Sequence, residues 1–147
     1  MKIMSVDLGD VRTGLAMCDR TEMLASPLGI IEDKNIDSIV QKVAVAAKEH
    51  AADMIVVGHP KHMNGSAGDR AKKSEDFANI LRELTNLPVT LWDERGTTVS
   101  AIGYLNETNT RGKKRKQVVD AVAAVIILEN YIAYRKNHPE ETVNNAL

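Results

Sequence analysis

The sequence predicts one α/β domain in which helices flank a mixed five-stranded sheet. Three short apolar segments open the chain, and the polar or glycine-bearing turns between them favour an antiparallel meander. Helical periodicity then alternates with continuous apolar runs, which favours parallel strands joined by crossover helices. A chain of 147 residues is long enough for one domain with its own core, so we expect a single domain over 1–147.

The opening strands are expected at Ile3–Asp7, Gly14–Cys18 and Leu24–Ile31. Pro27 lies inside the third segment, and proline cannot donate a ladder hydrogen bond, so this segment is expected to be an edge strand or to carry a bulge. A helix should follow, with Asn35 as its N-cap. Its apolar face repeats at helical spacing through Ile36, Ile39, Val40, Val43 and Ala47.

The second half of the chain repeats the strand-and-helix alternation. Strands are expected at Met54–Val57 and Val89–Trp92, with a loop over Gly58–Asp69. A helix between them has an apolar face made of Ala71, Ser74, Phe77, Ala78 and Leu81. Thr97 or Thr98 can cap a third helix that carries Ala101, Ile102 and Leu105. After a loop over Asn106–Gly112, the last helix contains the apolar stretch Val118–Ile132, and the tail beyond Asn137 is expected to fray.

Composition excludes several classes of protein. Apolar residues make up 44% and charged residues 27%, as in soluble globular domains, and no apolar run approaches the length of a bilayer span. The N-terminus has no signal-peptide pattern, so we expect a cytoplasmic protein. A single cysteine, Cys18, excludes an internal disulfide and a cysteine zinc site. Aromatic residues are only 3%, which disfavours a surface that holds many bases by stacking.

Acidic residues stand at three ends of predicted elements. Asp7 ends the first strand, Asp93 and Glu94 follow the last strand, and Asp120 lies in the apolar last helix. Clustered carboxylates repel unless a cation neutralises them, and oxygen ligands suit hard ions such as Mg²⁺ or Mn²⁺. If these positions converge, the sequence predicts metal-assisted attack on phosphate.

Each acid also has a simpler interpretation, and spacing alone leaves both open. Asp7 could cap a hairpin turn whose glycines take positive φ; the turn is not a P-loop, because Leu15-Ala16 follows Gly14. Asp93-Glu94-Arg95 could be a solvated loop, although Gly96-Thr97-Thr98 then opens a helix whose N–H groups could hold a phosphate. Asp120 could simply be an acid near a helix N-terminus, where the helix dipole stabilises a negative charge.

Two polar segments complete the candidate surface. Residues 111–116 carry five positive charges in six positions just before the last helix, where they could attract phosphate or form a solvated face. His59 and His62 are expected to be exposed loop histidines, because no ligand at suitable spacing completes a zinc site.

Together these segments resemble the YqgF family, also called RuvX or Holliday-junction-resolvase-like proteins. The resemblance covers residues 2–134 and rests on four motifs in order. They are Asp7-Leu8-Gly9 with Arg12 and Gly14-Leu15-Ala16; Val57-Gly58-His59-Pro60 with Met63-Asn64-Gly65; Asp93-Glu94-Arg95 with Thr97-Thr98; and Val119-Asp120-Ala121 with Ala123-Ala124 and Ile127-Leu128. His59, Lys61, His62 and Gly96 depart from the usual pattern.

The resemblance implies an RNase H-like fold and a nuclease that acts at the 5′ end of precursor 16S rRNA. It carries the acidic ligands onto Asp7, Glu94 and Asp120, and it favours Glu94 over Asp93, which strand alternation alone does not decide. Two Mg²⁺ or Mn²⁺ ions, bridged by Asp7, would support hydrolysis. The residues expected to hold the nucleic acid, a structured RNA, are Arg12, Asn64, Arg95, Thr98, Lys113, Lys114, Arg115 and Lys116.

Two rival functions remain from the sequence. A DNA junction resolvase would use the same chemistry and would need a dimer, whereas the sequence does not fix the oligomeric state. A non-catalytic RNA-binding factor for ribosome maturation could keep the fold without the reaction. Sugar kinases and actin-like ATPases also begin with an Asp-x-Gly turn, but they need a second domain for which 147 residues leave no room.

Overall fold

The computed structural model describes residues 1–59, 69–93 and 112–137, without the side chains of 69, 70 and 112–121. Its sheet has five strands in the order β3-β2-β1-β4-β5. The strands are β1 (Ile3–Asp7), β2 (Arg12–Cys18), β3 (Ala25–Glu32), β4 (Met54–His59) and β5 (Val89–Asp93). β1, β2 and β3 pair antiparallel, whereas β1–β4 and β4–β5 pair parallel, so the predicted meander with parallel extensions is confirmed.

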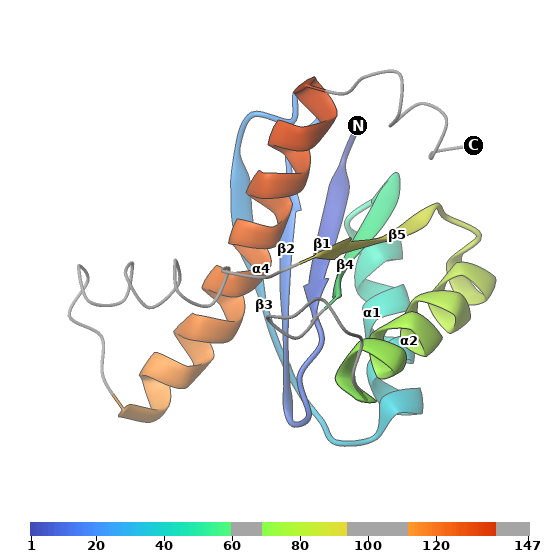
Figure 1. The fold of residues 1–147 in the computed structure, drawn as a ribbon, viewed down its shortest axis with the longest axis vertical. Helices are drawn as coiled ribbons and strands as arrows, with labels where there is room; N and C mark the ends of the chain where they lie inside the picture. Colours follow the sequence, from blue (N-terminus) through green and yellow to red (C-terminus); the bar gives the residue numbers. More distant parts are fainter. Residues whose placement is uncertain (60–68, 94–111, 138–147) are drawn as a thin grey trace.

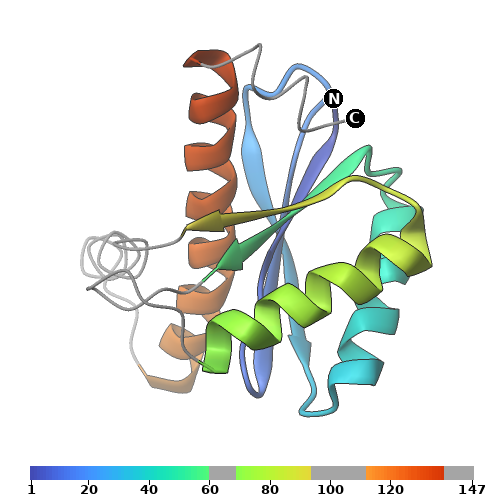
Figure 2. The ribbon, with the colours of Figure 1, turned by 45° about the vertical axis from the view of Figure 1, so that its right-hand side comes forward.

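Helices cover both faces of the sheet (Figures 1 and 2). One face packs on α1 (Ile36–Glu49) and α2 (Asp69–Thr85), and the other packs on α4 (Gly112–Asn137). Alternation along each strand explains this division: Met4 and Val6 of β1 belong to the α1/α2 core, whereas Ile3 belongs to the α4 core. Even-numbered side chains of β1 therefore face α1 and α2, and odd-numbered ones face α4.

The start of α1 is fixed by side chains, as the sequence predicts. Asn35 is the N-cap, and its side-chain oxygen accepts a hydrogen bond from the Ser38 N–H at 3.0 Å. Bonds from the Ser38 hydroxyl, the Asn35 N–H and the Lys42 ammonium hold the pKa of Asp33 well below its ordinary value. Asp33 therefore stays ionised and fastens the chain between β3 and α1.

Pro27 lies where its chemistry allows it. β3 is an edge strand of the sheet, and its ladder with β2 shifts register between Leu15 and Ala16, opposite Gly29 and Pro27. Gly29 has a φ of 150°, which only glycine adopts readily. Both predicted consequences of Pro27, an edge position and a bulge, are confirmed.

Several boundaries differ from the expectations, most by one or two residues. Gly58 and His59 belong to β4 rather than to a loop, because they continue the parallel ladder with β5 through Trp92 and Asp93. Asp69 is already the first residue of α2. The last helix begins at Gly112, so the basic residues 113–116 form its first turns instead of preceding it. The third helix expected near Thr97 lies outside the described residues.

Candidate active site

Asp7 ends β1 on the α4 face of the sheet, with glycine on each side of it. Its antiparallel partner is Gly14, and the β1–β4 register, which pairs Val6 with Val57, next brings Gly58 opposite Asp7. Glycine has no side chain, so neither Gly14 nor Gly58 places a side chain beside Asp7 in this row of the sheet. This arrangement is compatible with a metal ion or a phosphate next to Asp7.

Gly9 closes the turn after Asp7 by a close approach of backbone. A Cβ at this position would overlap the carbonyl oxygen of Arg12, and the Gly9 N–H donates to the Thr13 hydroxyl at 3.4 Å. Its φ is not in the left-handed region, so the positive-φ interpretation of this turn is wrong for Gly9. Glycine is needed here because the chain folds tightly against itself.

We expect Gly9→Ala to lower the free energy of unfolding by roughly 2 kcal/mol or more, because the added methyl group must displace the backbone of Arg12. Thermal melts measure this loss. Asp10→Ala is the control in the same turn, since the Asp10 side chain is 75% exposed, and it should cost less than about 1 kcal/mol. Equal melting of Gly9→Ala and the parent would contradict the close approach.

The helix that carries Asp120 is tied to β1 two residues before Asp7. The buried Ser5 hydroxyl donates to the carbonyl oxygen of Ala124 at 2.6 Å, and α4 runs opposite to β1 (Figure 1). Asp120 is one turn before Ala124, about 6 Å along the helix, and Asp7 lies about 6.6 Å beyond Ser5. Residues 7 and 120 therefore both lie on the same side of the Ser5–Ala124 hydrogen bond, toward the same end of the sheet.

Strand alternation separates Asp93 from Asp7. Trp92 packs on the α4 face, where its ring centroid lies 5.7 Å from that of Tyr131 and 5.2 Å from that of Tyr134. Its neighbour Asp93 therefore belongs to the opposite face, beside its register partner His59. Glu94 lies outside the described residues; a strand continued by one residue would bring position 94 back to the face of Asp7.

His59 is buried rather than exposed, so the expected loop histidine is wrong. Its side chain faces the α1/α2 layer, and its Nε2 lies 3.1 Å from Oε1 of Glu75 on α2. His59 pairs in register with Asp93. His59 is buried because β4 continues through this position. The pairing with β5 that extends the strand cannot be recognised from the turn-rich local sequence. His62 lies outside the described residues.

The structure describes only some of the residues that are predicted to contact the substrate. Arg12 begins β2 at half-burial, and alternation from Gly14 gives it the α4 face that Asp7 shares. Lys113, Lys114, Arg115 and Lys116 form the first turns of α4, with side chains that are not described. Asn64, Arg95 and Thr98 lie outside the described residues.

A metal site fits the donors at this edge but is not completed by the part of the chain that the structure describes. No group of three or more His, Cys, Asp or Glu side chains suitable for a metal occurs within it. Of the three predicted acids, only Asp7 has a described side chain. The carboxylate oxygens of Asp7, with glycine as its ladder partner, suit a hard divalent cation. The same described residues contain no helix with the length and hydropathy of a membrane span.

Comparison with known proteins assigns the family. The family model named RuvX, described as Holliday junction resolvase, matches residues 1–134. The chain belongs to the RuvX family. Two relatives of this RuvX-family protein carry the name "Putative pre-16S rRNA nuclease". The one from Desulfitobacterium hafniense is 41% identical over 91% of this chain and 93% of its own. The one from Halothermothrix orenii is 40% identical over 92% and 96%.

Solved structures agree with this assignment at the level of the fold. Thermus thermophilus RuvC in complex with a Holliday junction substrate superimposes with a TM-score of 0.61 at 11% identity, covering 93% of this chain and 96% of RuvC. The fowlpox virus Holliday junction resolvase gives a TM-score of 0.54 at 18% identity, covering 91% of this chain and 99% of the viral one. This RuvX-family protein therefore has an RNase H-like fold and belongs to a family of nucleases.

Proposed function

We propose that this protein is a metal-dependent nuclease that processes the 5′ end of precursor 16S rRNA in the cytoplasm. The observation that carries the proposal is the position of Asp7, with glycine on both sides, beside the helix that carries Asp120. The rRNA substrate rests on the names of the relatives, which share about 40% of their residues with this chain.

In this proposal, the three acidic residues belong to different parts of the fold. Asp7 from β1, Glu94 beyond β5 and Asp120 on α4 would hold the Mg²⁺ or Mn²⁺ ions through their carboxylate oxygens. When bound, such ions supply a Lewis acid for the phosphate and a water of lowered pKa. Arg12, Asn64, Arg95, Thr98 and the basic turns of α4 would hold the backbone of a structured RNA.

The reaction is tested with matched substrates. Precursor 16S rRNA ends, DNA duplexes of the same sequence and branched DNA should be incubated with Mg²⁺, with Mn²⁺ and with EDTA. We expect cleavage of the RNA with either ion and none with EDTA. Cleavage that persists in EDTA would refute metal dependence, and binding without cleavage of any substrate would favour a non-catalytic RNA-binding factor.

A Holliday junction resolvase is the second candidate, favoured by the description of the family model. It predicts preferential cleavage of branched DNA and a dimeric mass in solution, because two strands must be cut. Faster cleavage of the RNA by a monomer would exclude it.

The basic first turns of α4 predict a strong dependence of binding on salt. Changing Lys113, Lys114, Arg115 and Lys116 together to glutamine should flatten the log–log salt slope by about 3, because each lost phosphate contact removes roughly 0.7 to 0.9. Fluorescence anisotropy of labelled RNA at several salt concentrations measures the slope.

The control for that experiment uses exposed cations at the opposite end of the molecule. Arg20, Lys48 and Lys136 lie in the β2–β3 turn, near the end of α1 and near the end of α4. Their change to glutamine should leave the slope within about 0.5 of the parent. Equal slopes for both multiple variants would mean that the α4 basic turns are an ordinary solvated face.

A further inference from the structure

A hollow with an apolar wall and a cationic rim lies between the first halves of α1 and α2. Its volume is about 460 Å³, within the range of small-molecule sites. Ile36, Phe77 and Ile80 supply the apolar part, and Lys72, Lys73 and Asp76 supply the charges. Ile80 is 37% exposed and adds accessible apolar surface to the hollow.

The hollow adjoins the edge of the sheet where Asp7 lies. The Lys73 ammonium is 3.4 Å from the Asp10 carboxylate in the turn after β1. Asp10 is three residues from Asp7, and three residues span at most about 11 Å. Asp7 itself faces α4 on the other side of the sheet, so a strand that reaches both Asp7 and this rim must pass around this end of the sheet.

The charges on the rim favour an anionic occupant. Lys72 is exposed and makes no ion pair with any other described residue, and Lys73 is paired only with the well-solvated Asp10. An exposed pair of this kind is weak, so a phosphate can compete for the Lys73 ammonium. Asp76 adds an acceptor for the amino group of a base or a hydroxyl of a sugar.

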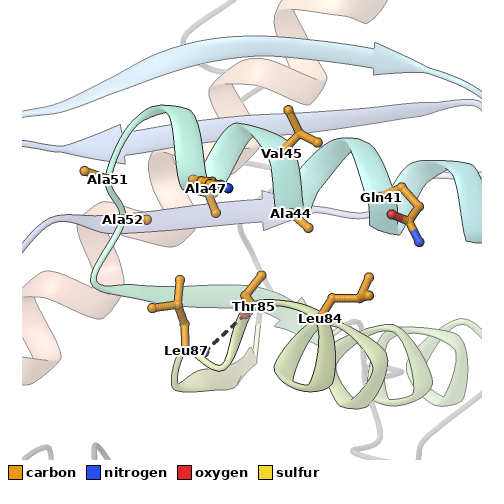
Figure 3. A pocket seen from close by; sticks show the side chains of 10 residues that line it. Gln41, Ala44, Val45, Ala47, Ala51, Ala52, Leu84, Thr85 and Leu87 are labelled. Carbon is orange, nitrogen blue, oxygen red and sulfur yellow. Dashed lines mark hydrogen bonds between the residues drawn. The ribbon is translucent and has the colours of Figure 1, made fainter.

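A second hollow between the same helices gives the contrast. It lies toward the ends of α1 and α2 (Figure 3). Among the described residues that line it, Lys48 alone is charged. Val45 and Leu84 make its wall apolar, at 52% and 43% exposure. It has neither two cations nor a contact with the turn after β1, so it serves as an internal control.

We propose that the hollow between Ile36, Lys72 and Ile80 binds one unpaired nucleotide of the substrate strand. Lys72 and Lys73 would contact its phosphate, and Ile36 and Ile80 would contact its base. Proteins that read single-stranded segments hold splayed bases most often on aromatic rings while cations track the backbone, and here aliphatic side chains would supply the surface for the base. This inference rests on the proposed nuclease function and adds a substrate subsite to it.

The test compares matched pairs of variants. Lys72→Gln is paired with Lys48→Gln, and Ile80→Ser is paired with Leu84→Ser, since each control lines the second hollow. Binding is measured with a single-stranded RNA and with a sugar-phosphate chain of equal length without bases, and thermal melts verify folding. Lys72→Gln should flatten the salt slope by about 0.7 for the RNA. Ile80→Ser should weaken RNA binding roughly tenfold and leave the base-less chain unaffected.

The outcomes separate this inference from the proposed function. A parent protein that neither binds nor cleaves nucleic acid overturns both. A parent that binds RNA, with Lys72→Gln and Ile80→Ser indistinguishable from their controls, overturns the subsite alone. If Lys72→Gln has an effect and Ile80→Ser has none, the proposal that the hollow binds the base is wrong, because a phosphate contact by itself needs no hollow.

Discussion

Replacing Asp7 by asparagine is expected to remove nuclease activity and to leave the metal-free protein at least as stable as the parent. Asparagine keeps the size of the side chain but removes the charge that would bridge two cations. The cleavage rate should fall by at least about a hundredfold, the scale of a lost positioned catalytic group. Converging carboxylates repel one another in the absence of metal, so losing one of them relieves that repulsion.

Thermal melts with and without Mg²⁺ give this prediction its second measurement. A metal at ten times its dissociation constant stabilises the folded state by about 1.4 kcal/mol, or roughly 3–5 °C for a domain of this size. The parent should gain this shift, and Asp7→Asn should not. Asp10→Asn, three residues on, keeps the same turn and serves as the control that should still respond. A parent that shows no shift at millimolar Mg²⁺ would count against a site of useful affinity.

The second large effect distinguishes two adjacent acids. Glu94→Gln should lower the cleavage rate at least about a hundredfold with near-normal folding. Asp93→Asn should lower the rate less and the stability more, because Asp93 ends β5 on the α1/α2 face, in register with the buried His59. Trp92 packs against α4, and Glu94 would share that face if the strand continued by one residue.

Both variants should be assayed and melted in parallel. An inactive Asp93→Asn together with an active Glu94→Gln would make the ligand assignment wrong, although metal-assisted hydrolysis could still operate. Equal losses of activity and stability in both variants would indicate that both residues maintain the structure of the strand end. Neither could then be assigned as the single metal ligand.

Local patterns in the sequence predicted the elements that local physics determines. The apolar face of α2 is buried as expected, from Ala71 to Leu81, because helical periodicity records which side meets the sheet. Asn35 caps α1 because capping depends on a side chain and a nearby N–H. Asp7 ends β1, and its position follows from the apolar run before it.

Features that depend on distant partners could not be predicted in this way. His59 is buried through its strand ladder and through Glu75, which is 16 residues away along the chain. The bond from Ser5 to Ala124 joins residues 119 apart, and only the small residues around Ala124 hint at close packing. The expectation that the basic run precedes the last helix was wrong because Lys, Arg and Gln are good helix formers, so a charged run can extend a helix as easily as precede it.

The most direct test of the central claim locates the metal itself. Crystals of the protein soaked with Mn²⁺ would show anomalous scattering peaks at the bound ions. The proposal predicts a peak within about 2.2 Å of an Asp7 carboxylate oxygen, with Glu94 and Asp120 oxygens completing its shell. A fully occupied Mn²⁺ site elsewhere, with none at Asp7, would contradict the proposed active site.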